Sequence, residues 1–137
     1  MKNFKFSRLY AAMIFVACFV LAGCKPEPNY ISSLKGDWAS QYDGYTISSD
    51  TIVYDDGGYG YGWTREIVEV SDEYIYSKDS DGKYYTTAYK NLTDDACEFS
   101  NAFKADGKSN AASLDEAKEE FTVANKYFAI YGKYSKK

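Results

Sequence analysis

An alternation of aromatic or β-branched residues with polar residues, broken by turn signals every eight to twelve residues, constrains the fold of this chain most. Alternation of this kind places successive side chains on opposite faces of a strand, and short connections rich in Gly, Asp and Ser make neighbouring strands pair antiparallel. The pattern predicts strands at residues 37–42, 44–48, 51–55, 62–70, 73–77, 83–92 and 96–103. Residues 34–137 are therefore expected to form one mainly β domain, a meander or a barrel.

One segment has helical periodicity instead. Apolar residues recur at helical spacing through SLDEAKEEF, where Ser113 and Glu116 match a capping box. This spacing predicts a short helix over 114–121. The following NKYFAIYGKY alternates again and predicts a last strand over 126–134.

The start of the chain has the composition of an export signal. Its first ten residues hold three basic residues and no acid, and an unbroken apolar run follows over 11–21. A helix that spans a bilayer needs about 20 apolar residues. The run is shorter than that, so we expect residues 1–23 to be a cleavable signal peptide and not a membrane anchor.

The end of this signal, Leu21-Ala22-Gly23-Cys24, resembles the lipobox of bacterial lipoproteins. The resemblance implies cleavage before Cys24, a diacylglyceryl group on its sulfur and a further acyl chain, such as palmitate, on the new amino terminus. Each buried methylene contributes about 0.8 kcal/mol, so two or more chains would anchor the protein firmly. Residues 24–33 are expected to be a lipidated tether. In many bacterial lipoproteins, an Asp after the lipidated cysteine retains the protein in the inner membrane. Lys25 occupies that position here, so we expect this protein in the outer membrane of the cell envelope, on the extracytoplasmic side.

The charge and the residue types exclude several functions. Removal of the signal would take away three of the 16 basic residues and none of the 20 acidic ones, which leaves a formal charge of −7. Nucleic-acid binding needs clustered Lys and Arg, so no nucleic-acid partner is expected. The chain has no His and no nucleophile or phosphate-loop motif. We therefore expect a protein that is not an enzyme and has no cofactor.

Two further features have ordinary structural interpretations. The segment Asp79-Ser80-Asp81-Gly82 resembles the opening of a calcium loop, but no Glu follows at the required distance. It predicts a hairpin turn with Gly82 in a left-handed conformation and no metal site. Cys97 is the cysteine that remains once Cys18 leaves with the signal and Cys24 is lipidated. It is expected to be a buried apolar residue on a strand.

The order of the predicted elements, together with Gly36-Asp37-Trp38, resembles the lipocalin family. The resemblance implies an eight-stranded barrel in which Trp38 plugs the closed end, the helix packs outside, and a small apolar ligand binds within. That family stacks a late Arg on the motif Trp. Arg65 is the sole Arg after residue 23, so Lys126 or Lys133 would have to take that place.

A different function follows if the barrel is filled by its own side chains. The protein would then be a structural or host-interaction lipoprotein at the cell surface, or would contact an envelope partner through its tyrosines. An aromatic-lined interior of a few hundred Å³ would favour the ligand, and a filled core would favour the interaction.

The most unusual local sequence is YDDGGYGYGW, residues 54–63, near a predicted hairpin tip. One hypothesis is a recognition loop in which Tyr59, Tyr61 and Trp63 contact a ligand or partner. The alternative is a tight, glycine-rich hairpin whose aromatic residues face the core or cover the sheet.

Overall fold

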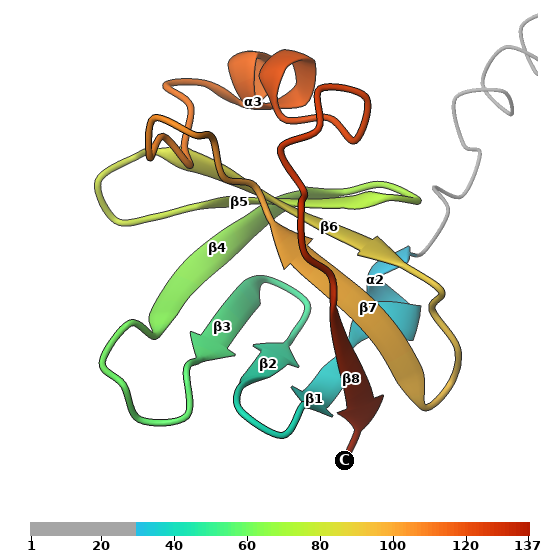
Figure 1. The fold of residues 1–137 in the computed structure, drawn as a ribbon. Helices are drawn as coiled ribbons and strands as arrows, with labels where there is room; N and C mark the ends of the chain where they lie inside the picture. Colours follow the sequence, from blue (N-terminus) through green and yellow to red (C-terminus); the bar gives the residue numbers. More distant parts are fainter. Residues whose placement is uncertain (1–29) are drawn as a thin grey trace, which may run out of the picture.

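The computed structural model describes residues 30–137, which form a closed barrel of eight antiparallel strands (Figure 1). The strands are β1 (Gly36–Ala39), β2 (Gly44–Ile47), β3 (Thr51–Asp55), β4 (Trp63–Val70), β5 (Tyr74–Lys78), β6 (Tyr84–Lys90), β7 (Ala96–Asn101) and β8 (Gly132–Lys136). Each strand pairs with the next in sequence, and β8 pairs with β1 to close the barrel. The predicted all-β class and the predicted meander order are confirmed.

The predicted helix before the last strand is also present, as α3 (Leu114–Glu120). Ser113 Oγ accepts the backbone N–H of Glu116 at 3.1 Å, as a capping box requires. The Glu116 carboxylate accepts the N–H of Ala112 at 2.9 Å, one residue before the position that the box predicts. The helix lies outside the barrel, where Ala117 and Phe121 pack on the outer face of β5 and β6 (Figure 1).

A short helix, α2 (Tyr30–Leu34), covers one end of the barrel. Leu34 is fully buried, and its carbonyl accepts the indole N–H of Trp38 at 2.7 Å. The end of the predicted tether, from Tyr30 onward, is thus part of the folded domain. The predicted signal peptide, Cys24 and the rest of the tether lie outside the described residues. Neither α2 nor α3 combines the length and the apolar character that a membrane-spanning helix requires.

The Gly-x-Trp triplet has a clear role at this closed end. Trp38 is 1% exposed, packs edge-on against Phe99 at 5.8 Å, and has Lys136 Nζ 5.1 Å from its ring centroid. Gly36 has φ +134°, and a Cβ there would lie 2.5 Å from Lys136 Cε. Glycine suits this position because other residues rarely adopt a positive φ, and their side chain would also displace the flexible end of Lys136.

The predicted partner of Trp38 was therefore wrong. Lys136, and neither Lys126 nor Lys133, covers the indole, because the register of the barrel pairs Trp38 directly with Lys136. Lys133 lies three residues earlier on β8, and Lys126 lies before that strand begins.

The predicted start of the last strand was also wrong, since β8 covers 132–136 and not 126–134. The residues before it cross from α3 to the barrel. Lys126 has φ +63°, the Tyr127 ring packs on Phe121 at 6.0 Å, and the Phe128 ring lies 5.8 Å from Tyr74. These aromatic side chains pack in the layer between α3 and the barrel. Their alternation in the sequence therefore reflects burial in that layer and not pairing in the sheet.

The closed end gives a first prediction. Replacement of Trp38 by Ala should lower the free energy of unfolding by about 3 to 5 kcal/mol, because it leaves a cavity and an unpaired Leu34 carbonyl. Urea denaturation followed by circular dichroism measures this. The matched control Tyr59→Ala, at a 78% exposed side chain, should change the value by less than about 0.5 kcal/mol. Equal effects of the two substitutions would contradict the assignment of Trp38 as the plug.

Candidate functional site: the open end of the barrel

The end of the barrel opposite α2 is formed by four connections. Because neighbouring strands are antiparallel, the β1–β2, β3–β4 and β5–β6 connections lie at this end, and the long β7–β8 connection begins and ends there; Figure 1 shows the β3–β4 and β5–β6 connections on the left. We call it the open end. The exposed large apolar side chains of residues 30–137 all belong to three of these connections, β1–β2, β3–β4 and the long β7–β8 connection; they are Tyr42, Tyr59, Tyr61, Phe103, Val123 and Ile130.

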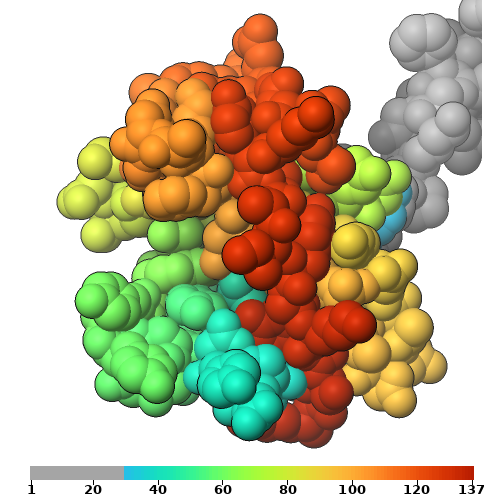
Figure 2. Space-filling model, viewed as in Figure 1, coloured from blue at the N-terminus to red at the C-terminus, as the bar shows by residue number. Residues whose placement is uncertain are grey.

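The barrel interior is filled at the closed end and hollow towards the open end. One buried cluster draws side chains from every strand, with Trp38, Ile52 and Ile75 almost without exposure. Beside it lies a cavity of about 470 Å³ that opens to the surface. Figure 2 shows the molecule hollowed on this face, between the C-terminal segment in red and the β1–β2 and β3–β4 connections in cyan and green.

Aromatic rings pack together in one part of the wall of this cavity. Tyr45, Tyr54, Phe99 and Tyr134 line it, and in four pairs their ring centroids lie 5.0 to 5.5 Å apart. Their strands β2, β3, β7 and β8 meet around the open end. The volume falls within the range of about 300 to 1,000 Å³ that small-molecule sites occupy.

The Asp43 carboxylate accepts hydrogen bonds from three hydroxyl groups at the rim of the cavity. Tyr54 and Tyr134 each donate a hydrogen bond of 2.9 Å to Asp43 Oδ2, and the Ser40 hydroxyl donates to Asp43 Oδ1. Ser40 also accepts the N–H groups of Tyr42 and Asp43, at 3.1 Å each. This turn ends β1 at Ala39 and not at the predicted residue 42. It thereby places Asp43 over the cavity.

An amide continues the polar network deeper into the barrel. Asn101 Nδ2 donates to the hydroxyl of Tyr45 at 2.8 Å, and Asn101 Oδ1 accepts the hydroxyl of Thr87 at 2.8 Å. Burial raises the pKa of Tyr45 well above its usual value of 10.0 and that of Tyr54 to about 12. All these groups stay neutral at physiological pH and present hydrogen-bonding hydroxyls beside apolar ring faces.

A second, smaller cavity of about 170 Å³ lies next to the first, and Asn101 lines both. Its walls include Trp63, Arg65 and Tyr85. The guanidinium carbon of Arg65 lies 3.8 Å from the Trp63 centroid and 3.4 Å from the Tyr85 centroid. Burial lowers the pKa of Arg65 to about 10, so the group remains charged at neutral pH.

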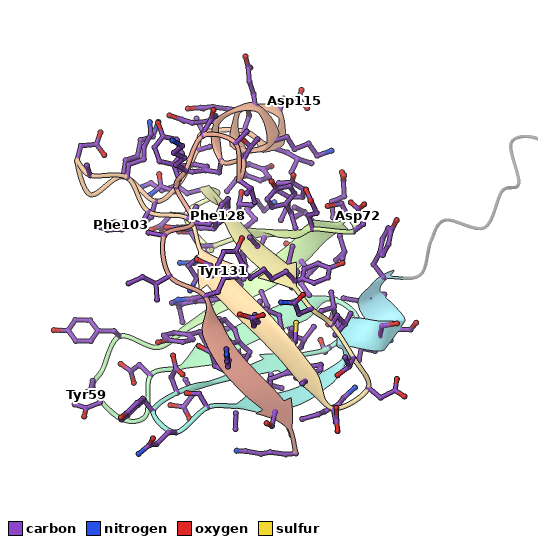
Figure 3. All side chains as sticks on the ribbon, turned by 45° about the vertical axis from the view of Figure 1, so that its right-hand side comes forward. Tyr59, Asp72, Phe103, Asp115, Phe128 and Tyr131 are labelled. Atoms are coloured by element: carbon purple, nitrogen blue, oxygen red, sulfur yellow. The ribbon has the colours of Figure 1, made fainter. Side chains whose placement is uncertain are left out.

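The structure separates the three aromatic residues of the predicted recognition loop. Tyr59 and Tyr61 are 78% and 80% exposed, and Figure 3 shows Tyr59 projecting away from the barrel. The Asp56 carboxylate accepts the backbone N–H groups of both tyrosines and so shapes the loop. Trp63 instead lies inside and stacks on Tyr54 at 5.6 Å. Trp63 therefore faces the barrel interior, whereas Tyr59 and Tyr61 are exposed on the loop.

The remaining predicted features lie where the sequence placed them. The Asp79–Gly82 segment is the β5–β6 turn, with Gly82 at φ +78°. Among residues 30–137, no group of three or more Cys, Asp or Glu side chains is placed to hold a metal ion. Cys97 is buried on β7 as predicted, and burial raises the pKa of its thiol to about 12.

Sequence reasoning missed Asp43, Asn101 and Arg65 as cavity residues. Alternation indicates that Tyr45 and Tyr54 share a face with the core, but it does not show that the barrel is hollow at their end. Arg65 follows the same alternation as Trp63, so a charged residue on an inward position of a strand was the signal that could have found it.

No protein-family model, curated protein or solved structure matches this chain. The candidate site is therefore interpreted from its own geometry.

The tyrosine network gives a second prediction, on alkaline stability. The pKa values of Tyr54 and Tyr76 are each raised to about 12 in the folded state, against 10.0 for the free side chain. The unfolded chain then loses protons first, so stability should be constant below pH 10 and fall as the pH rises towards 12. Spectrophotometric titration should show a late phase of tyrosine ionisation, near pH 12, to which Tyr54 and Tyr76 contribute.

A substitution isolates the contribution of Asp43. After burial, the hydrogen bond and charge of this carboxylate are what hold the pKa of Tyr54 up. Asp43→Asn should therefore move part of the late tyrosine absorbance to lower pH. Asp94→Asn, in the β6–β7 connection at the opposite end, should leave the curve unchanged. A late phase that is the same in both variants would show that Asp43 does not act on the cavity tyrosines.

Proposed function

We propose that this protein is a lipid-anchored lipoprotein of the cell envelope that binds a small molecule in the cavity at its open end, without catalysing a reaction on it. One observation carries the proposal. In a barrel whose closed end is filled by Trp38 and its neighbours, the other end carries a cavity of about 470 Å³ that opens to the surface and is lined by aromatic rings and polar groups. Its volume and mixed lining are those of small-molecule sites.

The lining indicates what kind of molecule fits. Tyrosine and phenylalanine rings offer flat apolar surface, and the Asp43 and Asn101 networks hold polar groups in fixed positions. Sites of this composition bind a ligand whose body is apolar and whose orientation is fixed by a few polar contacts. We therefore propose an amphipathic ligand in place of the wholly apolar one that the sequence suggests.

The position of the cavity is compatible with a lipid anchor. The chain enters the barrel through α2, at the closed end, and the cavity lies at the opposite end. A tether that begins at Cys24 would thus leave the open end free to receive a ligand or partner. The lipobox resemblance supports Cys24 as the lipidated residue, and Lys25 supports the outer membrane.

A second function is favoured by the exposed aromatic side chains around the same end. Tyr42 and Tyr59 are 71% and 78% exposed, and Ile130 at the cavity rim is 82% exposed. Figure 3 shows Tyr59 and Phe103 on one side of the molecule and Asp72 on the other. Clusters of exposed aromatic groups are typical of protein contacts. The competing proposal is a surface lipoprotein that contacts an envelope or host protein there.

The lipid anchor gives a third prediction. In the native cells, Cys24→Ser should abolish labelling by radioactive palmitate and move the protein out of the detergent-soluble membrane fraction or leave it as the uncleaved precursor. Cys97→Ser is the matched control and should label normally, since Cys97 is buried on β7. Undiminished labelling of the Cys24 variant would refute the lipoprotein assignment.

The cavity gives a fourth prediction. Native mass spectrometry of the protein purified from its own membranes should show a bound small molecule. Gln41→Trp, which puts a large ring at the mouth of the cavity, should remove most of it, whereas Ser49→Trp in the β2–β3 connection at the closed end should retain it. If the unaltered protein carries nothing, the surface-contact proposal replaces the ligand proposal.

A further inference from the structure

The Arg65 guanidinium lies in the smaller cavity without any partner that could neutralise it. It contacts the faces of Trp63 and Tyr85, but within residues 30–137 none of its N–H groups donates a hydrogen bond to a protein atom. The ion pairs of this part of the chain all join Lys to Glu. Arg65 thus holds a positive charge between two aromatic rings, with its donors directed to no protein acceptor.

The guanidinium is half-buried in a cavity that opens to the surface, where its donors can reach water. A guanidinium carries five N–H donors, and removing them from water without acceptors is unfavourable. Stacking on aromatic faces returns only part of that cost. The lowered pKa of Arg65, which burial causes, reflects this partial removal from water. A fold that holds an arginine in this way has room and chemistry for an anion.

The nearest acidic side chain does not fill this role. Asp79 Oδ1 accepts the backbone N–H groups of Asp81 at 3.0 Å and Lys83 at 2.9 Å, and Oδ2 accepts the Tyr85 hydroxyl at 2.9 Å. The carboxylate is therefore engaged in its own turn and orients the Tyr85 ring beneath Arg65. It lies close enough to attract the guanidinium, yet makes no ion pair with it.

Asn101 connects the smaller cavity with the larger one, because it lines both.

We propose that Arg65 binds the carboxylate group of an amphipathic ligand whose apolar body lies against the aromatic wall of the larger cavity. The inference rests on the proposed function and names the chemical class of the ligand. The planar guanidinium matches a carboxylate with two parallel hydrogen bonds. A singly charged carboxylate fits better than a phosphate, because Asp79 is nearby and the chain has a formal charge of −4.

Binding of three soluble probes of equal chain length tests the assignment. The full chain, reconstituted in lipid nanodiscs, is titrated with octanoate, octanol and octyl phosphate while the tryptophan fluorescence is followed, with empty nanodiscs as the blank. Trp63 reports binding directly because it stacks against Arg65. Octanoate should bind at least tenfold more tightly than octanol.

Two variants separate the charge of Arg65 from a general effect of charge. Arg65→Met keeps the length of the side chain and removes the guanidinium. It should lower the affinity for octanoate at least tenfold and leave that for octanol unchanged. Lys35→Met removes an exposed cation next to α2 that lines neither cavity, and both affinities should remain as in the unaltered protein. The thermal midpoint of Arg65→Met should change little, because Arg65 has no hydrogen-bond acceptor in the described residues to lose and a Met side chain still packs between the Trp63 and Tyr85 rings.

The outcomes distinguish the two proposals. If octanol binds as tightly as octanoate, or if Arg65→Met keeps the preference for octanoate, the cavity binds ligands but Arg65 does not hold a carboxylate. Tighter binding of octyl phosphate than of octanoate would overturn the carboxylate class. If the thermal midpoint of Arg65→Met falls sharply, Arg65 is structural and the inference fails. If no probe binds the unaltered protein, the proposed function fails as well.

Discussion

The packing of Trp38 at the closed end is the interaction on which the rest of the barrel depends. Its indole donates to the Leu34 carbonyl, packs edge-on against Phe99, and is covered by Lys136. These contacts tie α2 and the first, seventh and last strands to one side chain. They lie where β1 meets β8 through only two residue pairs, so the closure of the barrel relies on side-chain packing as much as on backbone hydrogen bonds.

Because one end is closed so firmly, the other end can remain open. The strands diverge from a filled core towards a rim of tyrosines, where Asp43 and Asn101 hold the hydroxyl groups that would otherwise lack partners. A polar network within a low-dielectric interior is stable only when its members are satisfied. The Arg65 guanidinium donates no hydrogen bond to the protein within residues 30–137, and its charge is the basis for proposing a ligand with an acidic group.

Much of the architecture could be predicted from local patterns. The turns at Asp79–Gly82 and the N-cap at Ser113 lie as predicted, because their residue types fix the backbone through contacts over a few positions. The last strand was misplaced because Tyr127 and Phe128 alternate like a strand yet pack under α3. An alternating pattern indicates that every second side chain is buried. It does not indicate whether those side chains pack in the barrel interior or against a helix outside it.

The sequence alone determined the order of the elements and the mainly β class, since these follow from side-chain periodicity and short-range turn chemistry. The burial of Trp38 was expected from the resemblance to the lipocalin family, and that of Cys97 from its residue type. The tertiary structure decided which lysine covers Trp38, where the barrel is hollow and that Arg65 is enclosed by Trp63 and Tyr85. Those features depend on barrel register and on side chains from distant strands. Each arises only when the sheet closes, and no local pattern encodes it.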